Sequence, residues 1–97
     1  MLGLFKSKTE RKLLKLERTM MTMERAAEQD NLGVLHQGMQ EQVKILNWLS
    51  LYGDRSENEV MEWIKNRGLV RSVHDDAIHD FMCKKGQDAE MTYGMIG

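Results

Sequence analysis

Residues 8–29 read KTERKLLKLERTMMTMERAAEQ, a stretch that contains neither proline nor glycine. Within it, apolar residues fall at alternating steps of three and four: Leu13, Leu16, Met20, Met23 and Ala27. This spacing lines up side chains along one side of an α-helix, where they form a seam for a second helix to cover. Ser7 and Glu10 have the spacing of a capping box, so we predict a helix over residues 8–29.

A second helix is predicted over residues 32–52, after the break at Asp30 and Asn31. Gly33 and Gly38 are expected to weaken it by about 1 kcal/mol each relative to alanine. The short break favours an antiparallel hairpin of the two long helices. The face expected to meet the first helix carries Leu32, Leu35, Met39, Val43, Leu46 and Leu49, widened by Ile45, Trp48 and Tyr52.

Two shorter helices are predicted after Gly53. Ser56 and Glu59 repeat the capping-box spacing before a helix over 57–67, and Gly68 lies where a left-handed cap is expected. Its inward residues are expected to be Val60, Trp63 and Ile64.

The last predicted helix covers residues 73–85 and opens with Ser72 and Asp75 as a further capping pair. Its apolar stripe consists of Val73, Ala77, Ile78, Phe81 and Met82. Residues 1–86 therefore predict one all-α domain, a long antiparallel helical hairpin followed by two short helices as a small helical bundle. Residues 87–97 are expected to form an irregular tail.

Charge is balanced over the whole chain but not along it. Fourteen basic and fifteen acidic residues leave 97 residues near neutrality, so bulk charge does not indicate nucleic acid. The first 18 residues nevertheless hold a basic cluster of Lys6, Lys8, Arg11, Lys12, Lys15 and Arg18. This segment could attach to an anionic membrane surface with Leu2, Leu4 and Phe5, bind a nucleic-acid backbone non-specifically, or be a solvated face.

Residues 74–80 hold the sequence HDDAIHD. Asp75 or Asp76 with His79 has the spacing of metal ligands on one helix face, but two ligands do not make a site, and a surface cap with local ion pairs is the preferred interpretation. The helix predicted over residues 57–67, the turn after it and the helix predicted over residues 73–85 have the proportions of a helix-turn-helix, a DNA-binding unit. Carboxylates at the leading end of the second helix would repel phosphates, so we expect no sequence-specific reading of DNA.

No pattern indicates catalysis. The glycines are isolated and form no phosphate-binding loop. Cys83 follows His79 by one helical turn without an orienting third group, so we expect a buried structural thiol. One cysteine forms no internal disulfide and no apolar run is long enough to span a bilayer, which favours a cytoplasmic location. We expect no enzyme activity, cofactor or metal.

Leu14 and Met21 widen the apolar side of the first helix beyond what one partner helix needs. Together with the six basic residues they are the candidate interaction site. Methionine-rich helices suit both irregular cores and adaptable binding surfaces. The leading hypothesis is a small non-enzymatic adaptor or inhibitor that binds another macromolecule through the surface of the first two helices. We expect a protein partner, with a homodimer as one form of that contact. A phage or other mobile element is our hypothesis for its origin.

Overall fold

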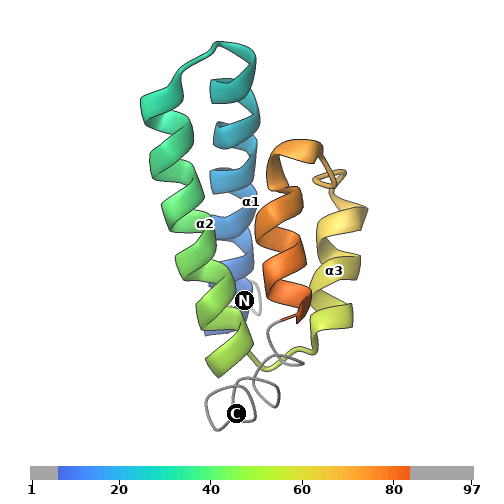
Figure 1. Ribbon diagram of the computed structural model, residues 1–97. Helices are drawn as coiled ribbons and strands as arrows, with labels where there is room; N and C mark the ends of the chain where they lie inside the picture. Colours follow the sequence, from blue (N-terminus) through green and yellow to red (C-terminus); the bar gives the residue numbers. More distant parts are fainter. Residues whose placement is uncertain (1–6, 84–97) are drawn as a thin grey trace, which may run out of the picture.

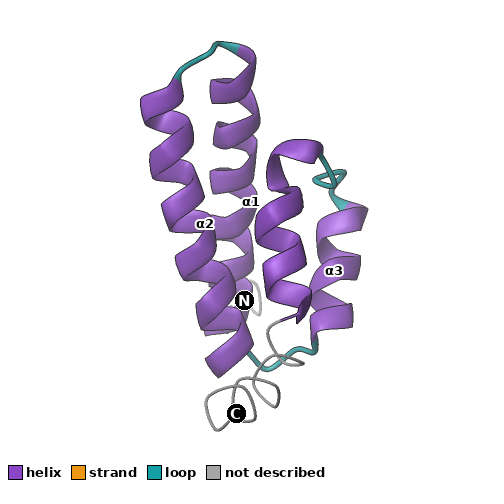
Figure 2. Cartoon of the chain, viewed as in Figure 1, coloured by secondary structure: helices purple, strands orange, loops and turns teal. Residues whose placement is uncertain are grey.

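The computed structural model describes residues 7–83; residues 1–6 and 84–97, including Lys6 and the predicted tail, lie outside the described part. Its helices are α1 (Lys8–Glu28), α2 (Leu32–Tyr52), α3 (Glu57–Asn66), a short 3₁₀ turn η2 (Ser72–His74) and a last helix over residues 75–83. Figure 1 shows α1 and α2 as an antiparallel hairpin, with α3 and the last helix packed back against it. Figure 2 shows the same chain with short loops between helices. The predicted all-α hairpin followed by two short helices is confirmed.

Local signals set the helix ends. The Ser7 hydroxyl accepts a hydrogen bond from the backbone N–H of Glu10 at 3.1 Å. At the other end of α1, Asp30 adopts a positive φ of 54°, and the backbone N–H of Asn31 donates to the carbonyl of Ala26 at 2.8 Å. This left-handed cap reverses the chain. Asn31 then caps α2 by accepting from the backbone N–H of Val34.

Four of the five predicted seam residues of α1 are buried, namely Leu13, Leu16, Met20 and Met23. Two details differ. The seam begins one turn earlier, at Thr9, and its last buried residue is Ala26, whereas Ala27 is half-buried. A straight α-helix has 3.6 residues per turn, so a strict three-four repeat drifts around it and the last position turns out of the contact.

The predicted buried face of α2 is correct only from Ile45 to Leu49, and Tyr52, which was expected to widen it, is exposed. Ile45, Leu46 and Leu49 are buried, but Leu32, Met39 and Val43 are exposed. The positions that turn inward instead hold Gly38 and Gln42.

Gly38 has a packing role that its low helix propensity does not reveal. A Cβ atom built on it would overlap the Cγ atom of Met23 on α1, whereas one built on Gly33 would meet no atom nearer than 3.9 Å. Gly38 therefore lets the two long helices approach closely at this level.

The capping predictions around α3 are confirmed. Ser56 and Glu59 form a reciprocal capping box, and Gly68 has a φ of 67°. The backbone N–H of Leu69 donates to the carbonyl of Ile64 at 3.2 Å, and both side chains are buried. This hydrogen bond and apolar contact define a Schellman ending.

The last helix begins differently from the prediction. Ser72 and Asp75 do not form a capping pair; the chain instead makes the 3₁₀ turn η2, with no side-chain hydrogen bond to its cap. Phe81 is buried in the core, and Ala77 and Ile78 pack against it. The core cluster joins all parts of the fold and consists of Leu13, Leu16, Met20, Ile45, Leu46, Leu49, Val60, Ile64, Leu69 and Phe81.

Candidate functional site

The charges of α1 are divided between two sides of the helix. Three of its glutamates face the second half of the chain, where each has an arginine nearby: Glu10 with Arg55 at 4.0 Å, Glu17 with Arg67 at 3.4 Å, and Glu24 with Arg71 at 3.8 Å. Lys12 and Lys15 instead contact Trp48 and Glu41 of α2, and Arg11 and Arg18 are exposed. The sequence shows a mixture of signs, whereas the folded helix presents its cations on a separate side.

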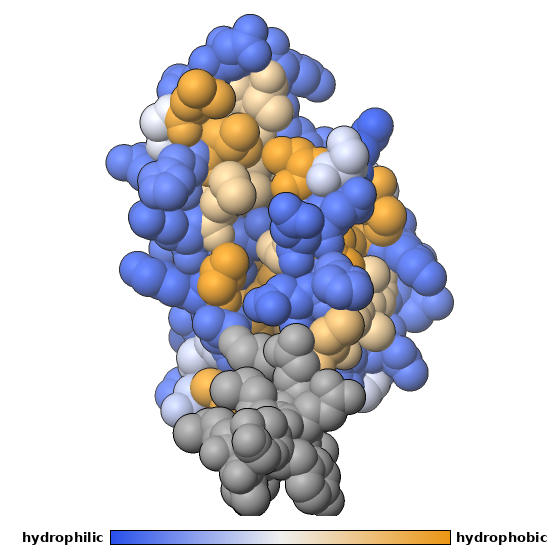
Figure 3. All heavy atoms as spheres, in the orientation of Figure 1, coloured by the Kyte–Doolittle hydropathy of each residue, from blue (hydrophilic) through white to orange (hydrophobic). Residues whose placement is uncertain are grey.

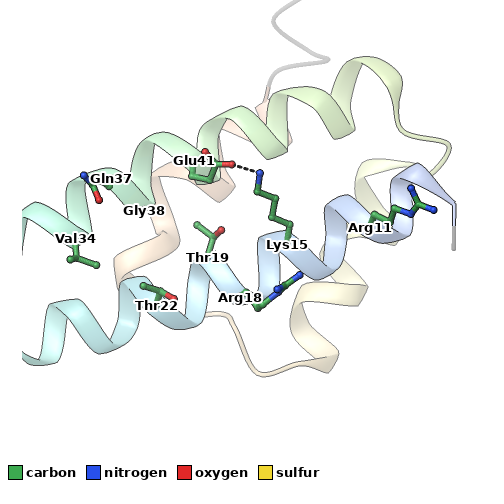
Figure 4. Close-up of a pocket in the computed structure, with 9 residues that line it drawn as sticks. All are labelled: Arg11, Lys15, Arg18, Thr19, Thr22, Val34, Gln37, Gly38 and Glu41. Atoms are coloured by element: carbon green, nitrogen blue, oxygen red, sulfur yellow. Dashed lines mark ion pairs between the residues drawn. The ribbon is translucent and has the colours of Figure 1, made fainter. Parts of the chain in front are cut away.

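A shallow groove of about 710 Å³ lies between α1 and α2 on this basic side. We call it the basic groove; its lining is Arg11, Lys15, Arg18, Thr19, Thr22, Val34, Gln37, Gly38 and Glu41. Figure 4 shows Lys15 on α1 extended towards Glu41 on α2, with Arg11 and Arg18 lying along α1.

Only one carboxylate lines the basic groove, and it is paired. The Lys15 Nζ atom lies 2.7 Å from Glu41 Oε1. The hydrogen bond and charge of Lys15 hold the pKa of the Glu41 carboxyl below its usual value. Arg11 and Arg18 belong to no ion pair among residues 7–83. These two guanidinium groups therefore remain available to an anion.

A second hollow of about 460 Å³ continues along the same side of the hairpin. We call it the aromatic end; its lining is Ser7, Lys8, Thr9, Trp48, Tyr52 and Asp54. The ring centroids of Trp48 and Tyr52 lie 6.0 Å apart, and the Lys12 ammonium lies 5.4 Å from the Trp48 ring centre. Tyr52 is 70% exposed. The basic side of α1 thus adjoins an open aromatic surface on α2.

The other predicted site residues have mixed positions. Leu14 is half-buried and Met21 is 50% exposed, and neither lines the basic groove or the aromatic end. Lys8, Arg11, Lys15 and Arg18 are exposed, and Lys12 is half-buried. The sequence identified the cations but not the α2 residues that complete the hollows, because those residues depend on how the hairpin pairs.

A different face of α2 is apolar and open. Leu32, Met39 and Val43, which we call the apolar stripe, are 73%, 43% and 41% exposed. Met39 and Val43 also line a hollow of about 280 Å³ against the last helix, together with Gln42, Val73, Asp76, Ala77 and Asp80. Figure 3 shows apolar side chains interrupted by polar ones on this side of the molecule.

His74 does not belong to a surface cap. It is fully buried, with its Nδ1 atom 3.0 Å from Gln42 Nε2 and its Nε2 atom 3.1 Å from Glu24 Oε2. An amide nitrogen donates and a carboxylate accepts, so these contacts fit a ring that carries its proton on Nε2. No sequence pattern indicates this network, because Gln42 and Glu24 lie 32 and 50 residues from His74 along the chain.

Cys83 is half-buried, not fully buried as expected, and its Sγ atom lies 3.6 Å from His79 Nε2. Among residues 7–83, no three His, Cys, Asp or Glu side chains gather closely enough to hold a metal ion. No helix in this part of the chain is both long and apolar enough to cross a membrane. Comparison with known protein families, curated proteins and solved structures finds no match to this chain.

Proposed function

We propose that the protein is a non-enzymatic interaction module that binds an amphipathic helix of another protein. The observation that carries this proposal is the exposed apolar stripe on α2. A helix in a small bundle normally turns its apolar side inward. Here three large apolar residues at helical spacing remain outside, beside a hollow that the last helix helps to form.

The stripe has the spacing of a helix-binding surface. Leu32, Met39 and Val43 are separated by seven and four residues, so they follow one line along α2 over about 16 Å, or three turns. A partner helix can place its own residues at i, i+3, i+4 and i+7 along such a line. Methionine in this position can adapt to the shape of the partner.

The borders of the stripe indicate the charge of the partner. Asp76 and Asp80 line the hollow beside Met39 and Val43, and both are exposed. A partner helix with lysine or arginine along one flank of its apolar seam would complement these carboxylates. Lys44, which lines a neighbouring hollow with Met39 and Val43, would favour an acidic or neutral residue on the other flank.

The test uses two designed helical peptides with the same leucine seam, one flanked by lysine and one by glutamate. Fluorescence polarisation of the labelled peptides should show binding of the lysine-flanked peptide and weaker binding of the other. Val43→Glu should weaken binding at least tenfold, because it places a charge in the apolar contact. Val70→Glu is the matched control, since it makes the same change at an exposed valine that lies outside α2 and lines neither hollow beside the stripe.

Binding of neither peptide, or equal binding by the Val43→Glu variant, would contradict the proposal. Light scattering provides a second arm. If the protein alone is a dimer that Val43→Glu dissociates, a second copy occupies the stripe, and the proposal of a foreign partner helix is wrong.

A further inference from the structure

We propose that the basic groove and the aromatic end together bind single-stranded nucleic acid, with phosphates along α1 and a base stacked on Tyr52. This site is separate from the apolar stripe. Glu41 lines the groove and Val43 belongs to the stripe, and residues two apart on a helix point in nearly opposite directions. Either proposal can therefore fail without the other.

The basic groove and the aromatic end carry more positive than negative charge. Four cations line the two hollows, namely Lys8, Arg11, Lys15 and Arg18, against two carboxylates. Glu41 is paired with Lys15, which leaves three cations against one carboxylate, Asp54. Three of the α1 glutamates, Glu10, Glu17 and Glu24, do not cancel them, because they face arginines on the opposite side of the helix. A polyanion binds where such cations are grouped.

The length of the α1 side and the polar groups that line the basic groove also fit a nucleic-acid strand. From Lys8 to Thr22 the α1 side measures about 21 Å. At about 3.4 Å for each phosphate of a stacked strand, this length matches about six phosphates. Thr19, Thr22 and Gln37 add hydroxyl and amide groups to the lining, and such groups contact phosphate and sugar oxygens in nucleic-acid complexes.

The aromatic pair of Trp48 and Tyr52 lies beside the cations of α1. Sequence-independent binding of single strands combines a basic groove with aromatic rings on which bases stack. The ring of Trp48 already has Lys12 over it, whereas Tyr52 is open to solvent beside it. Tyr52 is thus the ring that can accept a base.

The same features disfavour the two other anionic partners. A duplex keeps its bases inside, so Tyr52 would have nothing to stack on. A bilayer surface is broad, and the polar groups that line a groove between two helices would not insert into it. A flexible strand can enter the groove and reach the aromatic end.

The test measures fluorescence polarisation with fluorescein-labelled oligo(dT) and oligo(U) of about twelve nucleotides, twice the length that the groove spans. Binding should weaken with salt, with a log–log slope of about −2 for three phosphate contacts at about −0.7 each. Arg18→Gln should reduce the slope by about 0.7. Lys65→Gln on α3 removes the same charge elsewhere and should leave binding unchanged. Tyr52→Ala should weaken binding about fivefold or more, whereas Tyr52→Phe should not.

Binding of either oligonucleotide with these effects supports the proposal, and the tighter one identifies the sugar. Two further probes are a labelled duplex of the same length and vesicles of phosphatidylserine and phosphatidylcholine. The proposal is overturned if no oligonucleotide binds, if only the vesicles bind, or if the duplex binds equally well and Tyr52→Ala has no effect. All three substituted residues are exposed, and circular dichroism should show that each variant keeps its helices.

Discussion

Replacing Gly38 by alanine should destabilise the protein, although alanine is the better helix former. Alanine gains about 1 kcal/mol over glycine inside a helix. At this position its Cβ would overlap Cγ of Met23, whose side chain is fully buried. Overpacking a closed core costs about 1–3 kcal/mol. The net result should be a loss of about 1 kcal/mol.

Gly33→Ala is the matched comparison, since it makes the same chemical change in the same helix without a close neighbour. It should stabilise the protein by about 0.5–1 kcal/mol. The two variants should therefore differ by about 2 kcal/mol, which corresponds to about 8–16 °C in the midpoint of thermal unfolding for a chain of this size. Urea titration followed by circular dichroism measures both free energies of unfolding.

A Met23→Ala background isolates the cause. With the Cγ atom gone, Gly38→Ala should become stabilising by about 1 kcal/mol. The predicted clash between residue 38 and Met23 is refuted if Gly38→Ala stabilises the natural protein as much as Gly33→Ala does. It is also refuted if Met23→Ala leaves the effect of Gly38→Ala unchanged.

Three further predictions concern local features. Asp30→Gly should raise the free energy of unfolding by about 0.5–1 kcal/mol, because glycine adopts a φ of 54° without strain; an unchanged or lower thermal midpoint would contradict this. His74→Ala should cost about 2–4 kcal/mol in urea titration, because it leaves a cavity and removes a buried partner of Gln42; a loss below about 1 kcal/mol would show that the network contributes little. Hydrogen bonds from the backbone and side chain of Ser56 hold the pKa of Glu59 below its usual value. A lowered native pKa stabilises the fold above the unfolded pKa and ceases to do so as pH falls through the native one, so Glu59→Gln should reduce stability at neutral pH but not in strong acid.

The candidate site could be predicted from the sequence only on the α1 side. The basic residues repeat every three or four positions along one helix, so their grouping follows from helical geometry. Trp48 and Tyr52 lie beside them because α1 and α2 run antiparallel in one particular register, and no spacing along the chain records that register. The apolar stripe was misassigned to the core for the same reason.

The sequence by itself determined the helices and their ends except the start of the last helix, because caps and turns involve residues three to six positions apart. Ser56 with Glu59, and Ile64 with Leu69, act over such distances. Only the tertiary structure decided which side of α2 is buried. Close contact at Gly38 and the His74 network depend on residues brought together from distant parts of the chain. Steric fit and hydrogen bonding between helices therefore overrode the hydrophobic pattern and left the apolar stripe exposed.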